Sequence, residues 1–374
     1  MDYSAAAGEP LATAPDPLVD ELGPDLAAEV PYPGRPPLVL RPRGGELAQS
    51  IEAASQWFAD RTAVIDWLLV RHGALLLRGF PVRDTDAFTR LISHYRPHAA
   101  GYVGGATPRA AIKGAVYEAT QVPRQVTILL HQEMAYLKDY PVKLAFFCNS
   151  APDTGGATTV GDFRHFTAGL PGRFLTDLAE KGVTYHRSFR VPGVPHPSDG
   201  KPLPYHADLC QGFGTTSRYE IETACKRLGM SWEWEPDGSF TTHLSRPAFA
   251  EHPLTSERVY FNHILTQIVD PRWLGDEAYE TYLDVYDRAG RTRPYHVTYG
   301  DGTGIDMADH QLVADGLAAA TIAPGWQAGE VLLIDNIYTG HGRLPFTGHR
   351  DVQVALIDLA ASPGQYQVPA ARPR

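Results

Sequence analysis

The chain has 374 residues, of which 33 are basic and 43 acidic, and its hydrophobic fraction of 43% is normal for a globular protein. The acidic balance argues against nucleic acid as a partner, and no apolar stretch approaches the roughly 20 residues of a membrane span. The three cysteines form no CxxC pair and the first 22 residues lack a signal-peptide pattern, so we expect a cytoplasmic protein.

The first 40 residues are rich in proline, which forbids long helices, and we expect an extended N-terminal arm there. Residues 41–374 contain no good linker and are expected to form a single domain. Apolar residues recur with a helical period from 46 to 72, and Gly73 stands where a glycine ends a helix. This stretch therefore predicts helical structure that ends at Gly73.

Short apolar runs further along the chain predict strands. They lie at residues 74–80, up to 131, 142–148, 155–162, 330–334 and 351–358. Residues 163–320 form a long insertion, in which Ser217 and Glu220 fit a capping box, Gly229 fits a helix stop, and 276–289 predicts another helix. Strands at both ends with a helical insertion between them predict a mainly β fold, a double-stranded β-helix or jelly roll with helical additions.

One His-x-Glu pair lies where a predicted strand ends. Residues i and i+2 of a strand project from the same face, so His131 and Glu133 can point at one spot. A catalytic metal needs a third ligand, and His341, which follows the predicted strand 330–334, is the candidate. Two histidines and one carboxylate with open positions are typical of non-haem Fe(II) oxygenases, although Zn²⁺ accepts the same ligands.

Another His-x-acid pair, His206 and Asp208, competes with the first. It lies in a proline-rich stretch that no apolar strand precedes, so we favour the pair at His131. An alternative interpretation of the first pair is a buried histidine beside a solvent-facing carboxylate. His341 alone is an equally weak signal, and its surroundings are what strengthen it.

An arginine close to the distal histidine has a specific use. A 2-oxo acid chelates iron through its keto and carboxylate oxygens, and its far carboxylate needs a partner. Arginine binds a carboxylate bidentately, which suits Arg350, and Thr158 could add a hydroxyl donor. The competing interpretations are a surface salt bridge for Arg350 and an ordinary strand threonine for Thr158.

These residues, taken with the segments around them, resemble the TauD/TfdA family of Fe(II)- and 2-oxoglutarate-dependent dioxygenases, in particular its SyrP-like and clavaminate-synthase-like members. The resemblance covers nearly the whole chain from about residue 37. The segments that carry it are HGALLLRGF at 72–80, HQEMAYLKDYP at 131–141, GGATTVGD at 155–162, GFGTTSRYEIE at 212–222, FNH at 261–263, WQAGEVLLIDN at 326–336 and HGRLPFTGHR at 341–350.

The resemblance implies Fe(II) at His131, Glu133 and His341, 2-oxoglutarate at Arg350 and Thr158, and O₂ as the oxidant. Two departures stand out. Gln132 occupies a position where such members usually have Asn, and His349 one where they often have Pro. The acid at Glu133 argues against the halogenases of this class, which have Gly or Ala there.

The implied activity is hydroxylation of a small-molecule substrate in natural-product biosynthesis, such as antibiotic biosynthesis. We expect an amino acid or amino-acid unit, free or carried on a peptidyl carrier domain, with Arg109, Asn262 and Gln132 as substrate-binding residues. The same residues would serve desaturation, epoxidation or cyclisation. Two other classes stay open, a zinc hydrolase and a non-enzymatic jelly-roll binding protein.

Overall fold

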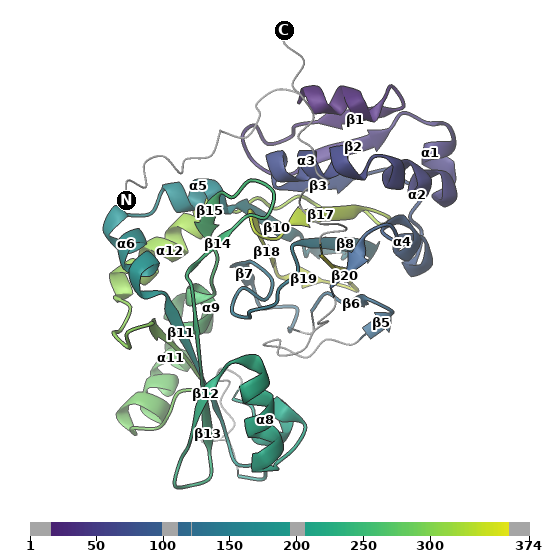
Figure 1. The fold of residues 1–374 in the computed structure, drawn as a ribbon. Helices are drawn as coiled ribbons and strands as arrows, with labels where there is room; N and C mark the ends of the chain where they lie inside the picture. Colours follow the sequence, from purple (N-terminus) through teal and green to yellow (C-terminus); the bar gives the residue numbers. More distant parts are fainter. Residues whose placement is uncertain (1–15, 99–110, 121, 195–205, 359–374) are drawn as a thin grey trace. The chain divides into compact units, whose positions relative to one another are not determined.

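The computed structural model describes residues 16–98, 111–120, 122–194 and 206–358 (Figure 1). They fall into two compact units. The first comprises residues up to 170, residues 250–261 and residues from 315 onward, and the second comprises residues 171–249 and 262–314. The second unit lies within the predicted insertion. The predicted single domain of 41–374 stays a prediction, and each unit is described by itself.

A large sheet forms the framework of the first unit. Nine of its described strands take part, in the order β1-β2-β3-β17-β8-β20-β6-β5 with β4 beside β20. Only the β2–β3 pair is parallel. The strands are β1 (Leu26–Glu29), β2 (Leu38–Pro42), β3 (Ala74–Leu77), β17 (Val331–Asp335), β8 (Lys143–Ser150), β20 (Asp351–Asp358), β6 (Val116–Glu118), β5 (Ala111–Lys113) and β4 (Arg96–Pro97).

The predicted N-terminal arm is in part a piece of this sheet. A 3₁₀ helix, η2 (Pro17–Leu22), is followed by β1 and β2, and β2 pairs with β3. Residues 1–15 lie outside the described residues. The arm therefore stays a prediction for its first part, while its second part contributes β1 at the edge of the sheet and β2 beside it.

Helices cover one face of the large sheet. They are α1 (Gly45–Gln49), α2 (Ile51–Asp60), α3 (Thr62–His72) and α4 (Thr85–Leu91). Because side chains alternate along a strand, Ala145 and Phe147 of β8 reach the apolar core under these helices. The helical structure predicted for 46–72 is confirmed, and it consists of three consecutive helices, since the Ser50 hydroxyl accepts from the Ala53 N–H at 3.2 Å and begins a new helix. The predicted stop at Gly73 is confirmed, with φ 73° and its N–H bonded to Leu69.

A second, smaller sheet faces the other side of the large one. It consists of β10 (Thr158–Asp162), β18 (Thr339–Arg343) and β7 (Ile128–His131), with β18 in the centre. Phe146, the residue of β8 that points away from the helices, lies with its ring centroid 5.0 Å from that of His341 in β18. Two facing antiparallel sheets confirm the expected fold class, a mainly β jelly-roll core with helical additions.

The second unit contains a four-stranded antiparallel sheet in the order β12-β13-β11-β16. The strands are β12 (Ser231–Trp234), β13 (Phe240–Arg246), β11 (Val183–Phe189) and β16 (Tyr295–Tyr299). Helix α8 (Arg218–Leu228) packs Ile221 and Cys225 against Phe240 of this sheet. Its predicted start and stop, Ser217 and Gly229, are confirmed.

The remaining elements include one longer helix, α12, and several short ones. They are α5 (Phe163–Ala168), α6 (Gly172–Lys181), α7 (Leu209–Phe213), α9 (Ile264–Gln267), α10 (Pro271–Leu274), α11 (Asp276–Tyr282), η3 (Leu283–Arg288), α12 (Met307–Ala320), β9 (Thr154–Gly155), β14 (Phe249–Glu251), β15 (Arg258–Tyr260) and β19 (Phe346–Thr347). Helix α11 and its π-helical continuation η3 together confirm the helix predicted at 276–289.

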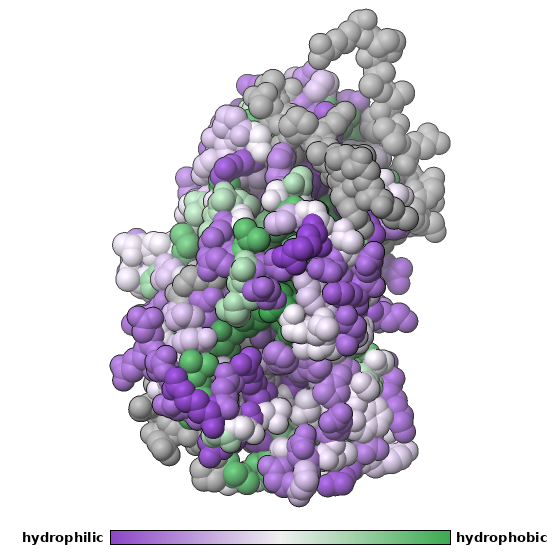
Figure 2. Space-filling view, turned by 90° about the vertical axis from the view of Figure 1, so that its left-hand side faces the viewer, coloured by the Kyte–Doolittle hydropathy of each residue, from purple (hydrophilic) through white to green (hydrophobic). Residues whose placement is uncertain are grey.

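The face of the molecule drawn in Figure 2 is mainly hydrophilic, with hydrophobic residues gathered in a band across its middle. Within the described ranges, no helix is long and apolar enough to cross a membrane.

Candidate metal centre

The two histidines of the predicted triad lie directly opposite each other on neighbouring strands. His131 at the end of β7 and His341 in the middle of β18 are Cα partners in the antiparallel ladder, with ring centroids 4.4 Å apart. Glycine flanks His341 on both sides for a steric reason. A Cβ at Gly342 would collide with the Ile128 carbonyl of β7, and one at Gly340 with the Phe163 ring. The close approach of these strands therefore requires the Gly-His-Gly sequence.

Glu133 completes the cluster. Its Oε2 lies 3.4 Å from Nε2 of His341, and one ligand atom from each of the three residues lies within 4.8 Å of the others. Nδ1 of His131 lies 2.9 Å from the Leu129 carbonyl, so it donates to that oxygen and Nε2 keeps its lone pair. Two imidazole nitrogens and one buried carboxylate are the donor set that Fe(II) accepts. The residues present fit such an ion.

Asn336 holds the backbone of Glu133 from both sides. Its Oδ1 accepts from the Glu133 N–H at 2.7 Å, and its Nδ2 donates to the carbonyls of Glu133 at 3.0 Å and Pro141 at 2.7 Å. Asn336 is completely buried. Met134, which follows Glu133 in the chain, has φ 59°, a strained value for a non-glycine residue. Asn336 was not predicted as a functional residue, although its place directly after an apolar strand was a usable signal.

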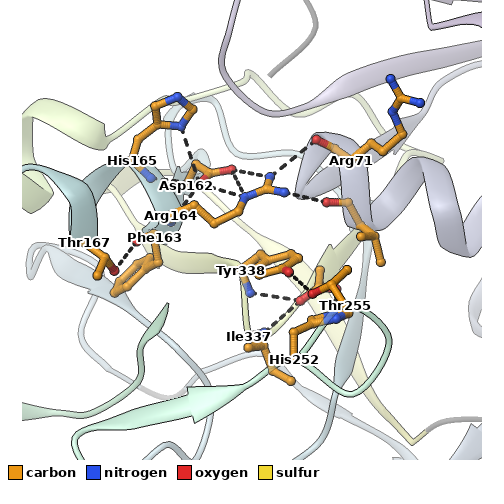
Figure 3. A network of polar contacts seen from close by, with 12 residues as sticks. Arg71, Asp162, Phe163, Arg164, His165, Thr167, His252, Thr255, Ile337 and Tyr338 are labelled. Atoms are coloured by element: carbon orange, nitrogen blue, oxygen red, sulfur yellow. Dashed lines mark hydrogen bonds and ion pairs between the residues drawn. The ribbon is translucent and has the colours of Figure 1, made fainter. Parts of the chain in front are cut away.

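The turn that carries Asn336 is itself braced by Asp335, whose partners His252, Ile337 and Tyr338 are labelled in Figure 3. One carboxylate oxygen accepts from the N–H groups of Ile337 at 3.0 Å and Tyr338 at 2.9 Å, and the other lies 2.8 Å from Nε2 of His252. Burial alone would raise the pKa of Asp335, but His252 and the two backbone donors hold it below its ordinary value. The carboxylate therefore stays ionised and keeps the turn between β17 and β18 in shape.

A buried ion pair supports the same turn from β10 (Figure 3). Asp162 binds Arg164, whose guanidinium carbon lies 4.3 Å from the centre of the Tyr338 ring and whose Nη1 donates to the Val70 carbonyl. Burial raises the pKa of Asp162, but Arg164 and His165 outweigh this effect and hold it at about 2. The ion pair ties the end of β10 to the turn that leads into β18.

The two residues predicted to bind 2-oxoglutarate are in contact. Arg350 donates from Nε to the Gly156 carbonyl at 2.9 Å and from Nη2 to the Thr158 hydroxyl at 3.1 Å, and Trp326 donates to the same hydroxyl at 3.0 Å. Burial and then the nearby Arg343 lower the pKa of Arg350 to about 10, so it remains cationic at neutral pH.

Arg343 is the second cation at this place, and sequence reasoning missed it. It bonds only to backbone carbonyls, those of Val122, Pro123 and Val126. Neither Arg343 nor Arg350 forms an ion pair within the part of the chain that the structure describes. A buried cation, Arg343, and a half-buried one, Arg350, neither with a carboxylate ion pair among the described residues, are suited to receive an anion.

Comparison with known proteins identifies the family. The model for the taurine catabolism dioxygenase TauD, TfdA family matches residues 43–356. The chain belongs to the TauD/TfdA dioxygenase family. The expectation of an oxidoreductase that depends on Fe(II), 2-oxoglutarate and O₂ is thereby confirmed.

The chain is also similar to individual proteins. The dapdiamide synthesis protein DdaC of Enterobacter agglomerans is 32% identical over 79% of this chain and 84% of its own. A clavaminate synthase-like protein of Arabidopsis thaliana is 29% identical over 87% and 94%. Among solved structures, PvcB from Pseudomonas aeruginosa is 16% identical over 86% and 85% of the two chains with a TM-score of 0.45. The family assignment rests on the family model and on DdaC.

The structure of this TauD/TfdA member describes two of the three predicted substrate-binding residues, Gln132 and Asn262. Gln132 is fully buried, and its amide donates to the carbonyls of Tyr260 and Ile337 at 2.8 Å each. Asn262 donates to the Ala248 carbonyl at 2.9 Å. Arg109 lies outside the described residues. Gln132 and Asn262 thus bind backbone groups, and a role for any of the three in substrate binding stays a prediction.

The rival pair does not form a similar cluster in this dioxygenase. Nδ1 of His206 lies 3.1 Å from the hydroxyl of Tyr286. Asp208 is the N-cap of α7, where its carboxylate accepts from the Gln211 N–H at 2.9 Å in a complete capping box. Among the residues with described positions, only His131, Glu133 and His341 form a group of three or more His, Cys, Asp or Glu whose ligand atoms all lie within 4.8 Å of one another.

Proposed function

We propose that this dioxygenase hydroxylates an amino acid or amino-acid-derived intermediate, free or tethered to a peptidyl carrier domain, in cytoplasmic natural-product biosynthesis. Iron is held by His131, Glu133 and His341, and 2-oxoglutarate by Arg350 and Thr158. The observation that carries the proposal is the closeness of the three donor residues, whose ligand atoms lie within 4.8 Å of one another on the small sheet of the jelly roll.

Each of these residues has a definable task. Iron with 2-oxoglutarate supplies the activation of O₂ for oxidation of a C–H bond. His131, with Nδ1 donating to Leu129, offers Nε2 as a neutral ligand, and Glu133 supplies negative charge that a divalent cation offsets. Arg350 offers its guanidinium to the far carboxylate of 2-oxoglutarate, with the Thr158 hydroxyl beside it. Arg343 adds positive charge nearby.

The amino-acid substrate class has two supports. The chain resembles the SyrP-like members of its family, and a relative at 32% identity is named for dapdiamide synthesis. The sequence of the insertion at 163–320 contains arginines such as Arg187 and Arg190 among many aromatic residues, a composition that suits recognition of a zwitterion. The net acidic charge is a mild point against docking on an acidic carrier domain.

The test is incubation of the enzyme with Fe(II), ascorbate and 2-oxoglutarate against a panel of amino acids, free and phosphopantetheine-bound. Mass spectrometry should find a gain of one oxygen atom on an amino-acid substrate, together with formation of succinate. A loss of two hydrogens would replace hydroxylation by desaturation or ring closure. Oxidation only of lipids, sulfonates or nucleobases would refute the amino-acid class.

The metal assignment has a matched control in the rival pair. His341→Ala should abolish succinate formation, whereas His206→Ala should retain it, because His206 lies with Tyr286 and outside the donor cluster. Loss of activity in His206→Ala with retention in His341→Ala would move the iron site to the other pair.

A further inference from the structure

Three histidines form a row across the sheet of the second unit. His186 of β11 is the Cα partner of His243 on β13 and of His296 on β16. Directly opposed residues of antiparallel strands project from the same face. The three imidazoles therefore stand side by side, with His186 in the centre and ring centroids 4.9 Å from His243 and 5.5 Å from His296.

The contact between the two closest rings restricts their protonation. Nδ1 of His186 lies 2.7 Å from Nδ1 of His243, so at least one of these nitrogens has no proton and accepts from the other. Nε2 of His186 lies 3.1 Å from the Thr298 hydroxyl. Nε2 of His243 is buried, has no hydrogen-bond partner, and lies 3.9 Å from a carboxylate oxygen of Glu233. A buried nitrogen without a partner is costly unless a ligand satisfies it.

A cavity of about 460 Å³ adjoins the row. It is lined by His186, Glu233, Glu235, Thr241, His243, Thr292, Arg293 and His296. Arg293 is neutralised by a bidentate pair with Asp287, at 2.7 Å for each bond. Glu233 and Glu235 therefore give the cavity a net negative charge. The imidazole rings beside them offer nitrogen lone pairs. These charges favour a divalent cation over an anion, and imidazole ligands favour a transition metal over Ca²⁺ or Mg²⁺.

We propose that this row is a second metal site, which binds a divalent transition ion such as Zn²⁺ through His186 and His243, with Glu233 or His296 completing the shell. The site is separate from the iron triad. The donors do not all lie as close together as those of the triad, and binding requires the rings to part. With Zn–N bonds of roughly 2.0–2.1 Å, two tetrahedral ligand nitrogens lie about 3.3 Å apart, against 2.7 Å between the Nδ1 atoms.

Zinc stoichiometry of the full chain tests the proposal, measured by equilibrium dialysis with elemental analysis. Wild type should bind two Zn²⁺ per chain. The double variant His131→Ala/His341→Ala should retain one ion, and adding His186→Gln to it should weaken that ion's binding by about tenfold or more, the scale expected when a metal site is perturbed. His165→Gln, which changes a half-exposed histidine of α5, is the matched control and should leave both ions bound.

Enzyme activity checks separately whether His186→Gln still folds. His186→Gln in the otherwise native chain should retain 2-oxoglutarate-dependent succinate formation, since this residue belongs to the row and not to the triad. His296→Gln offers a second variant if His186→Gln fails to fold. The proposal is overturned if the chain without the iron triad binds no Zn²⁺, or if it binds Zn²⁺ with unchanged affinity after His186 and His243 are both replaced by glutamine.

Discussion

Replacing Asn336 by alanine tests how the carboxylate of the iron site is held. The change removes three hydrogen bonds to buried backbone groups, the N–H and carbonyl of Glu133 and the carbonyl of Pro141. A buried polar group left without a partner costs about 1–3 kcal/mol. The sum would be about 3–9 kcal/mol, and entry of water into the space left by the side chain reduces it. We expect a loss of about 3–5 kcal/mol in the free energy of unfolding.

The second expected effect concerns iron. Loss of a residue that orients a metal ligand typically costs about ten- to a hundredfold in metal affinity. Because Asn336 fixes the backbone of Glu133, Asn336→Ala should weaken Fe(II) binding by about that factor under conditions in which the variant is folded. The binding of 2-oxoglutarate to Arg350 should change less, since Asn336 makes no hydrogen bond to that arginine.

Urea unfolding and anaerobic Fe(II) titration measure the two effects. Asn149→Ala is a matched control, because the amide of Asn149 makes one bond to the Asp351 carboxylate on a partly exposed site. It should change stability by about 1 kcal/mol and leave iron affinity unaltered. If Asn336→Ala were as mild as this control in both measurements, the hydrogen bonds of Asn336 would not be what positions Glu133.

Three further predictions concern His131, Arg350 and Asp162. His131→Ala should eliminate Fe(II)-dependent succinate formation while circular dichroism stays native, since it removes one of three donors. Arg350→Ala should weaken 2-oxoglutarate binding by roughly ten- to a hundredfold, because a charged hydrogen bond contributes about 1.5–3 kcal/mol. Arg350→Lys should restore the binding only in part, since lysine lacks the planar fork of donors. An unchanged requirement for 2-oxoglutarate in Arg350→Ala would exclude Arg350 from the site. Asp162→Asn should destabilise the protein by about 2–3 kcal/mol at pH 7. The folded-state pKa of Asp162, about 2, lies below its ordinary value of 3.8, so this difference from wild type should shrink as pH falls from about 4 towards 2, and a difference that stays constant over this range would contradict the assignment.

The elements that the sequence predicted well are those with local signals. Gly73 ends α3, and Ser217 and Gly229 bound α8, because a cap acts within about four residues of itself and needs no distant partner. The second half of the expected capping box fails for a local reason too, since the Glu220 carboxylate accepts from Thr215. The helical stretch predicted for 46–72 divides into three helices at Ser50, whose side chain caps α2, and at Arg61.

The residues proposed as iron ligands were also named from the sequence. The i, i+2 spacing of His131 and Glu133 on a strand end, together with the family resemblance, was enough to name the triad and Arg350. The sequence did not reveal which residues hold the triad and Arg350 in place. Asn336 binds a backbone N–H and backbone carbonyls of segments distant in sequence, and Arg343 binds only such carbonyls. Neither residue type predicts from sequence which backbone group it will bind.

The sequence by itself determined which residue types lie on each strand face, because side chains alternate with a period of two. Only the tertiary structure decided which strands are neighbours and in what register. His131 meets His341 because β7 pairs with β18, and His186 meets His243 and His296 because β11 lies between β13 and β16. Register depends on hydrogen bonds between segments far apart in the chain, and a shift of one residue would turn every side chain to the other face.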